Sequence, residues 1–250
     1  FLSMIGVLLI QCLLFADGGL LALGCNVWNM SVYGCFIGAG VIWRLIMKKG
    51  ISKKKIIFAS ILGCVLTLQL GAFSVVLETS ASKITELPFS SFVSLMQLIH
   101  LAIGLVEGLI TSAVLCFIYE TRADILWLSN NNLEEGKKLF SLKKFILIFV
   151  VLSVVIGGGV SLFASEHPDG LEWSIENIIG STELEGEGST QETAEKIQST
   201  TAILPEYAFK DSDSSLGTSV SGIVGGIVVI AVCIGGAFLI KIVGRKKKCE

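Results

Sequence analysis

Long apolar stretches constrain this chain more than any other feature of its sequence. Five stretches qualify as membrane spans, because a bilayer core about 30 Å thick requires roughly 20 apolar residues per helix. They are Val27–Met47, Ile56–Leu77, Phe89–Ile118, Phe145–Phe163 and Val220–Val243. The chain is 52% hydrophobic and only 16% charged, which is too apolar for an ordinary soluble domain of 250 residues. We therefore predict an all-α membrane protein.

A sixth apolar stretch, Phe1–Ala16, is shorter and does not begin with Met. It lacks a basic leading segment and a small-residue cleavage site before Asp17, so a signal peptide is not favoured. The stretch continues directly into the next membrane segment. We interpret it as part of a membrane helix, which gives about six transmembrane segments with the first one partial.

Lys and Arg residues predict the orientation of these segments, because basic loops stay in the cytoplasm. They gather in three clusters, at residues 44–55, 137–144 and 241–248. If each stretch crosses the membrane once, all three clusters fall on one side. We therefore predict a multi-pass membrane protein whose C-terminus is cytoplasmic.

The last two apolar stretches are joined by a long outer loop, residues 164–219. Between Glu166 and Gly217 this loop carries twelve acidic residues and only two lysines. Such a polyanion could raise the local cation concentration, or it could simply solvate a linker. Residues 181–201, rich in Glu, Ser, Thr and Gly, are predicted to be flexible, whereas Leu171–Ile178 is predicted to form one or two amphipathic turns.

The chain is predicted to have two domains. Residues 1–128 form a compact run of spans with short connections. Residues 129–142 are polar and turn-prone, as expected for a cytoplasmic linker. Residues 143–250 then form a hairpin of two helices joined by the outer loop.

Ionisable residues at membrane depth mark candidate functional positions, because each costs free energy unless it is partnered. His100 lies near the middle of its span, and Glu107 follows seven residues later on the same helical face. The two could help to form a polar cavity. Alternatively, His100 is a neutral imidazole bonded to a backbone carbonyl, and Glu107 is a protonated, hydrogen-bonded carboxyl group.

Several motifs are absent from the sequence. There is no phosphate-binding Gly-x-x-x-x-Gly-Lys-Ser/Thr loop and no His-Glu-x-x-His zinc motif. The seven cysteines have no metal-type spacing and indicate no disulfide framework. Small-residue pairs at four-residue spacing (Gly34/Gly38, Gly104/Gly108 and Gly222/Gly226) predict close helix packing. These observations do not favour an enzyme.

Three segments carry a resemblance to a known family. Residues 15–30 (FADGGLLALGCNVWNM) resemble a signature of the substrate-capturing membrane subunit of energy-coupling-factor transporters for cobalt and nickel. Residues 97–111, which include His100 and Glu107, are similar to a second motif of that family. Residues 167–172 (HPDGLE) resemble the small two-helix PDGLE-type component that is often fused to this subunit.

The resemblance implies a transport function. Such a subunit captures Co²⁺ or Ni²⁺ outside a prokaryotic cell. A transmembrane coupling protein and cytoplasmic ATPase subunits supply the work. We then expect no catalytic residue, no bound cofactor and no nucleic-acid partner for this chain. Nitrogen ligands and geometry would select these ions over magnesium.

The resemblance also implies roles for individual residues. The family's metal ligands lie at a Met-His N-terminus and on a further His in an early Gly-rich loop, so we expect an N-terminally truncated subunit that binds metal weakly or not at all by itself. Possible supporting or cavity-lining groups are Asp17, Asn26, His100 and Glu107. Possible docking or gating residues on the outer face are Asp169, Gly170 and Glu172.

Two other classes of function remain open. A channel or secondary transporter could use the His100/Glu107 face as an ion path and would work without ATPase partners. A non-transporting scaffold could use the acidic loop to bind an external protein. The sequence does not distinguish cobalt from nickel.

Overall fold

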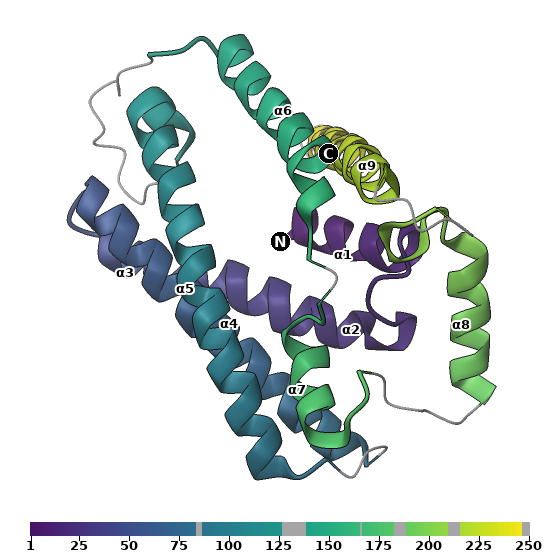
Figure 1. Ribbon diagram of the computed structural model, residues 1–250. Helices are drawn as coiled ribbons and strands as arrows, with labels where there is room; N and C mark the ends of the chain where they lie inside the picture. Colours follow the sequence, from purple (N-terminus) through teal and green to yellow (C-terminus); the bar gives the residue numbers. More distant parts are fainter. Residues whose placement is uncertain (84–86, 127–138, 166, 183–188, 210–215, 247–250) are drawn as a thin grey trace. The chain divides into compact units, whose positions relative to one another are not determined.

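The computed structural model describes residues 1–83, 87–126, 139–165, 167–182, 189–209 and 216–246, and within these ranges every regular element is a helix (Figure 1). The elements are α1 (Leu2–Leu14), η1 (Leu20–Ala22), α2 (Leu23–Asn26), η2 (Val27–Trp43), α3 (Arg44–Met47), α4 (Lys53–Ser82), α5 (Phe89–Arg122), η3 (Ala123–Ile125), α6 (Leu142–Gly158), η4 (Val160–Phe163), α7 (Gly170–Ile179), α8 (Ser189–Thr201), η5 (Pro205–Tyr207) and α9 (Leu216–Lys246). Helix η2 is wound as a π-helix.

Five helical segments are long and apolar enough to cross a membrane. They are Leu20–Met47, Lys53–Ser82, Phe89–Ile125, Leu142–Phe163 and Leu216–Phe238, and α1 is a shorter apolar helix beside them. These segments coincide with the five predicted spans and the predicted partial one. The prediction of an all-α membrane protein is confirmed.

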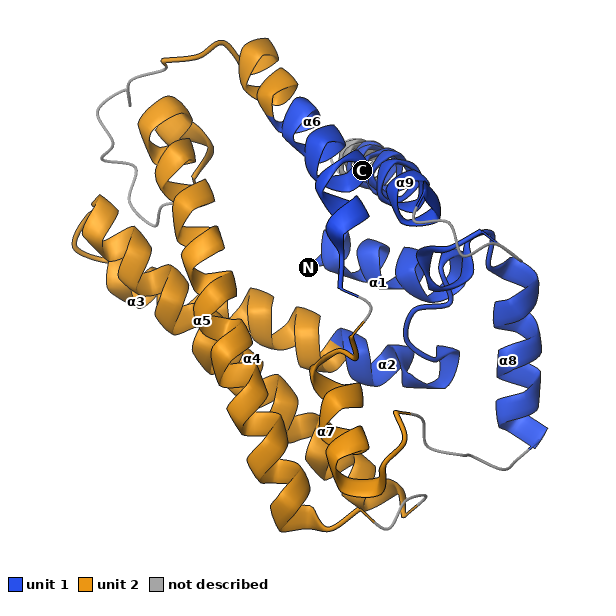
Figure 2. Ribbon diagram, in the orientation of Figure 1, with its two compact units in different colours: residues 1–27, 149–165, 187–250 blue, residues 28–148, 166–186 orange. Residues whose placement is uncertain are grey.

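The chain divides into two compact units, coloured separately in Figure 2. Unit 1 contains residues 1–27, 149–165 and 187–250, and unit 2 contains residues 28–148 and 166–186. Each unit therefore takes residues from both predicted domains. The predicted boundaries at residues 128 and 143 stay predictions, and most of the predicted linker lies outside the described residues.

Helices α4 and α5 form the centre of unit 2 as an antiparallel pair. Gly104 of α5 lies against the backbone of Val65, and Gly108 lies against Ile61 one turn earlier on α4. A Cβ atom added to Gly108 would lie 2.7 Å from the Ile61 Cα atom. The predicted small-residue packing is thus confirmed for this pair, since only glycine allows so close an approach.

The two ends of the α4–α5 pair are packed differently. Where α4 begins, Met47, Ile56 and Ala59 form a buried cluster, and Lys53 makes an ion pair with Glu120 near the end of α5. Ser52 caps the start of α4 by accepting a hydrogen bond from the Lys55 amide at 3.4 Å. At the opposite end the buried cluster also includes residues of α7.

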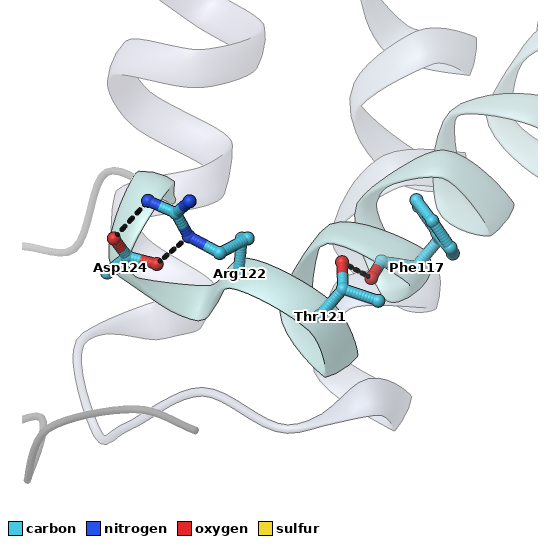
Figure 3. A network of polar contacts seen from close by, with 4 residues as sticks. All are labelled: Phe117, Thr121, Arg122 and Asp124. Atoms are coloured by element: carbon cyan, nitrogen blue, oxygen red, sulfur yellow. Dashed lines mark hydrogen bonds and ion pairs between the residues drawn. The ribbon is translucent and has the colours of Figure 1, made fainter. Parts of the chain in front are cut away.

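A polar network terminates α5 (Figure 3). Arg122 donates two hydrogen bonds to the Asp124 carboxylate, from Nε at 2.7 Å and from a terminal nitrogen at 2.8 Å. The Thr121 hydroxyl donates to the Phe117 carbonyl at 2.7 Å. Arg122 is only 9% exposed, so this bidentate pairing supplies the partner that a buried guanidinium requires.

Unit 1 is built around α1 and α9. Ile10, Phe15 and Leu204 form its buried cluster, with Val228 and Val229 of α9 packed against it. Gly225 of α9 lies against the Phe15 ring. Gly157 of α6 and Gly222 of α9 lie backbone to backbone, so one member of the predicted Gly222/Gly226 pair makes the expected close contact.

Helix α8 corrects one sequence prediction. Residues 189–201 are helical, so the prediction that 181–201 is flexible is wrong for this part; residues 183–188 lie outside the described residues. Ala194 and Gln198 are buried on one side of the helix. Gln198 donates hydrogen bonds to the carbonyls of Cys12 at 3.1 Å and Gly18 at 3.0 Å. This distant anchor stabilises a segment whose composition alone favours disorder.

Candidate functional site

The most distinctive arrangement in unit 2 is the seat of α7 on the α4–α5 pair. Ile175 of α7 is buried with Ala72 and Val76 of α4 and with Phe92 and Met96 of α5. Leu171 and Ile178, one turn to either side, pack against the same cluster. The predicted amphipathic turns at Leu171–Ile178 are confirmed as a ten-residue helix whose apolar side is buried.

His100 lies directly beneath the start of α7. Its Nδ1 atom is 2.8 Å from the Met96 carbonyl oxygen, so this nitrogen donates the hydrogen bond, because a carbonyl oxygen can only accept. A Cβ atom on Gly170 would lie 3.1 Å from His100 Cε1 and 3.2 Å from Ile103 Cδ1. Glycine at position 170 therefore allows α7 to lie close over the imidazole.

Asp169 and Glu172 hold the start of α7. The Asp169 Oδ1 atom accepts hydrogen bonds from the Leu171 and Glu172 amides, both at 2.8 Å. In return, Glu172 Oε2 accepts from the Asp169 amide at 3.2 Å. This reciprocal pair is a capping box, in which two helix-terminal donors are satisfied. The hexapeptide at residues 167–172 thus has a structural role that the resemblance did not indicate.

Glu107 lies two turns further along α5 than His100 and is exposed. Asp17 and Asn26 belong to unit 1, whereas His100 and Glu107 belong to unit 2. The four predicted supporting residues therefore divide into two pairs. Within unit 1, Asn26 lies close to Gly18, because a Cβ atom there would be 3.0 Å from the Asn26 amide nitrogen.

Asp17 is part of a polar cluster in unit 1. The Gln11 side-chain amide donates to Asp17 Oδ2 at 3.2 Å, and the Tyr207 hydroxyl donates to the same oxygen. The Tyr207 ring also stacks on Phe15, with 4.9 Å between ring centroids. Burial first, and then the hydrogen bond to Asp17, raises the pKa of Tyr207.

The segment that carries Tyr207 is attached to α1 by backbone hydrogen bonds. The Ile203 amide donates to the Leu14 carbonyl at 3.0 Å, and the Glu206 amide donates to the Phe15 carbonyl at 2.7 Å. Glu206 and Tyr207 both have left-handed backbone angles, with φ of 51° and 60°. Such conformations are costly for side chains with a Cβ atom, so surrounding contacts must maintain them.

Polar pairs between η2 and α4 were missed by the sequence analysis. The Asn29 side-chain amide donates to Glu78 Oε2 at 2.8 Å, and the hydroxyls of Tyr33 and Ser74 are 2.7 Å apart. A Cβ atom on Gly71 would lie 2.8 Å from the Asn29 carbonyl oxygen. The available signal was the four-residue spacing of polar residues in both apolar helices, 29 with 33 and 74 with 78.

The second resembling segment contributes a further polar contact. The Gln97 side-chain amide donates to the Gln69 backbone carbonyl at 3.0 Å, and the Gln69 side-chain amide donates to the Gln97 backbone carbonyl at 2.9 Å. This reciprocal pair joins α4 to α5 three residues before His100. Among the described residues, no group of three or more His, Cys, Asp or Glu could hold a metal ion.

Two known protein families match this chain. Residues 1–125 match the family described as the cobalt uptake substrate-specific transmembrane region, and residues 143–242 match the PDGLE domain. The chain belongs to the cobalt uptake family. Both Asp17 and His100 lie in the first match, and α7 lies in the second.

Similar proteins come from several organisms. A protein of Archaeoglobus fulgidus named as a fused nickel transport protein is 31% identical over 234 residues, which is 92% of this chain and 69% of that protein. A metal transport protein of Haloquadratum walsbyi is 31% identical over 55% of the chain, and a cobalt transport protein of Methanocaldococcus jannaschii is 32% identical over 48%. The chain spans 62% and 51% of those two relatives. No solved structure matches the chain significantly.

Proposed function

We propose that this chain is a membrane component for the uptake of cobalt or nickel ions. The observation that carries the proposal is the match of residues 1–125 to the cobalt uptake family, in a chain with five segments able to span a membrane. Membership of that family favours transport over an enzymatic role.

We propose that the chain works with a transmembrane coupling protein and cytoplasmic ATPase subunits. The sequence contains no phosphate-binding loop, so hydrolysis of ATP would occur in those partners. The three basic clusters would face the cytoplasm, as would the C-terminus. The start of α5 and helix α7 would then lie at the outer end of unit 2, on the side from which the ion enters.

We propose that α7 gates the region around His100. Gly170 lies over the imidazole, and Ile175 attaches α7 to both α4 and α5. Lifting α7 would uncover His100 and expose the buried cluster at the same time. The capping box of Asp169 and Glu172 would support this role by keeping the first turn of α7 helical over the ring.

The other predicted residues would act indirectly. Asp17 and Asn26 would orient the chain around Gly18, at the start of the segment Leu20–Met47. Asp17 precedes Gly18 in the sequence and accepts a hydrogen bond from Gln11, and the Asn26 side chain lies close to Gly18. Glu107 would line the ion path from the same helix as His100. The acidic outer loop would raise the local cation concentration, since its charge is strongly negative.

An uptake assay tests the proposal. Cobalt and nickel accumulation is measured in prokaryotic cells that lack their own uptake system and express the chain with its coupling protein and ATPases. The chain alone is compared with the chain preceded by the Met-His segment, to which the resemblance assigns the metal ligands. We expect accumulation of cobalt or nickel, but not magnesium, that stops when the ATPases are inactivated.

Two results would contradict the proposal. Uptake that continues with inactive ATPases and responds to a proton gradient would indicate a channel or secondary transporter. If neither form accumulates either metal although both reach the membrane, a scaffold function becomes the better account.

A further inference from the structure

A groove runs along unit 2 beside the contact between α4 and α5. It has a volume of about 490 Å³ and opens to the surface. Its lining includes Phe58, Ile61 and Val65 of α4 and Leu105 of α5, and Lys54 lies at one end. Among the residues that the structure describes, Lys54 is the only charged one that lines it.

The groove lies beside the closest contact between α4 and α5. Gly104 and Gly108 bring the α5 backbone against Val65 and Ile61, and Leu105 projects beside this contact. Phe58 is 59% exposed and Leu105 is 47% exposed.

The three consecutive lysines at the start of α4 differ in their contacts. Lys53 is paired with Glu120, and Lys55 donates to the Gly50 carbonyl at 2.7 Å. The Lys54 side chain is exposed and makes neither an ion pair nor a hydrogen bond with any described residue. Of these three lysines, Lys54 at the end of the apolar groove is therefore the one whose charge is available to a ligand.

We propose that this groove binds an anionic phospholipid, with one acyl chain along α4 and α5 and the phosphate held by Lys54. Lys54, Phe58, Ile61 and Val65 follow one another at spacings of four, three and four residues, which places them on one face of α4. A phospholipid carries an anionic phosphate at one end of an apolar acyl chain. This matches the order of the groove, in which Lys54 is followed by apolar side chains. Basic pockets beside transmembrane helices bind anionic head groups in this way.

The dimensions agree with a lipid of one leaflet. Lys54 and Val65 are eleven residues apart, which corresponds to about 16 Å along an α-helix. Half of a hydrocarbon core of about 30 Å is about 15 Å. Lys54 lies in the first turn of α4, at the end of a candidate span, where the head groups of a bilayer would be.

Lipid binding to the purified full chain tests this proposal. Binding of phosphatidylglycerol and of phosphatidylcholine with the same acyl chains is measured in detergent by native mass spectrometry, with inorganic phosphate as a separate competitor. We compare Lys54→Gln with Lys49→Gln, a neighbouring exposed lysine that does not line the groove. We expect phosphatidylglycerol to bind about five-fold more tightly than phosphatidylcholine, and Lys54→Gln alone to abolish this preference.

A second pair of variants tests the apolar part. Leu105→Trp fills the groove, whereas Val106→Trp changes the adjacent exposed position of α5. We expect Leu105→Trp to weaken the binding of both lipids and Val106→Trp to leave the binding of both unchanged.

Equal binding of the two lipids to the unmodified chain would overturn the proposal, as would equal effects of Lys54→Gln and Lys49→Gln. Full displacement of lipid by inorganic phosphate would indicate a simple anion site, and an unaffected Leu105→Trp variant would place the lipid elsewhere.

Discussion

The seat of α7 in unit 2 and the attachment of residues 203–207 in unit 1 both connect the outer loop to membrane helices, but by different means. In unit 2, Ile175 enters an apolar cluster and the first turn of α7 is capped by its own residues. In unit 1, the Tyr207 ring stacks on Phe15, its hydroxyl group bonds with Asp17 and Gln11, and its backbone is left-handed. The first arrangement combines apolar packing with a local helix cap, whereas the second adds polar side-chain bonds, one of which requires the Tyr207 hydroxyl proton.

The largest effect on stability is expected at the close contact between α4 and α5. Gly108→Ala places a Cβ atom 2.7 Å from the Ile61 Cα atom, so α5 must move away from α4. We expect a loss of about 1–3 kcal/mol in the free energy of unfolding, measured by denaturation in detergent micelles. The control is Gly63→Ala in α4, where an added Cβ atom meets nothing within 4 Å. Equal stability of the two variants would contradict the close packing.

A smaller effect is expected at the cap of α7. Asp169→Ala removes the acceptor for the Leu171 and Glu172 amides and should destabilise α7 by about 0.5–2 kcal/mol. Amide hydrogen exchange over residues 170–179 measures this directly. Asp169→Ser, which retains a capping oxygen, should keep most of the protection. If exchange is unchanged in the alanine variant, tertiary packing alone holds α7.

The smallest effect is expected in unit 1 and depends on pH. Tyr207→Phe removes the hydroxyl group that donates a hydrogen bond to Asp17 and accepts one from Gln11 at 3.3 Å, which should cost about 0.5–1.5 kcal/mol at pH 7. Tyrosine in an unfolded chain has a pKa of about 10. Burial is the larger cause that raises the pKa of Tyr207 above this value, and the hydrogen bond to Asp17 is the smaller one. Its contribution is therefore complete below pH about 10 and is lost as the pH rises through the folded-state pKa.

Unfolding measured at pH 7 and pH 11 checks this dependence. The stability difference between the original chain and Tyr207→Phe should be smaller at pH 11. A difference that is the same at both pH values would mean that packing on Phe15, rather than the hydroxyl proton, attaches this segment.

Local patterns predicted much of the fold. The length of the apolar stretches predicted the spans, and the Gly104/Gly108 spacing predicted one helix contact, because both signals lie within a single segment. The Asp169-x-x-Glu172 spacing is also a recognised signal for a helix start, although it was interpreted only as part of a family motif. The structure shows that it caps α7.

Contacts between distant segments could not be predicted in the same way. Helix α8 depends on Gln198 binding carbonyls of Cys12 and Gly18, and nothing near Gln198 in the sequence indicates those partners. The Asn29–Glu78 bond likewise joins two separate helices.

The proposed gating by α7 is tested most directly by cobalt and nickel uptake in two variants of the same helix. Ile175→Ala removes the buried side chain that joins α7 to α4 and α5, whereas Ile179→Ala changes a side chain that is 48% exposed. The assay uses the chain with its ATPase partners and compares variants present in the membrane at equal amounts. We predict that Ile175→Ala alters the uptake rate several-fold and that Ile179→Ala does not. Uptake at the original rate in both variants would show that the seat of α7 over His100 has no part in transport.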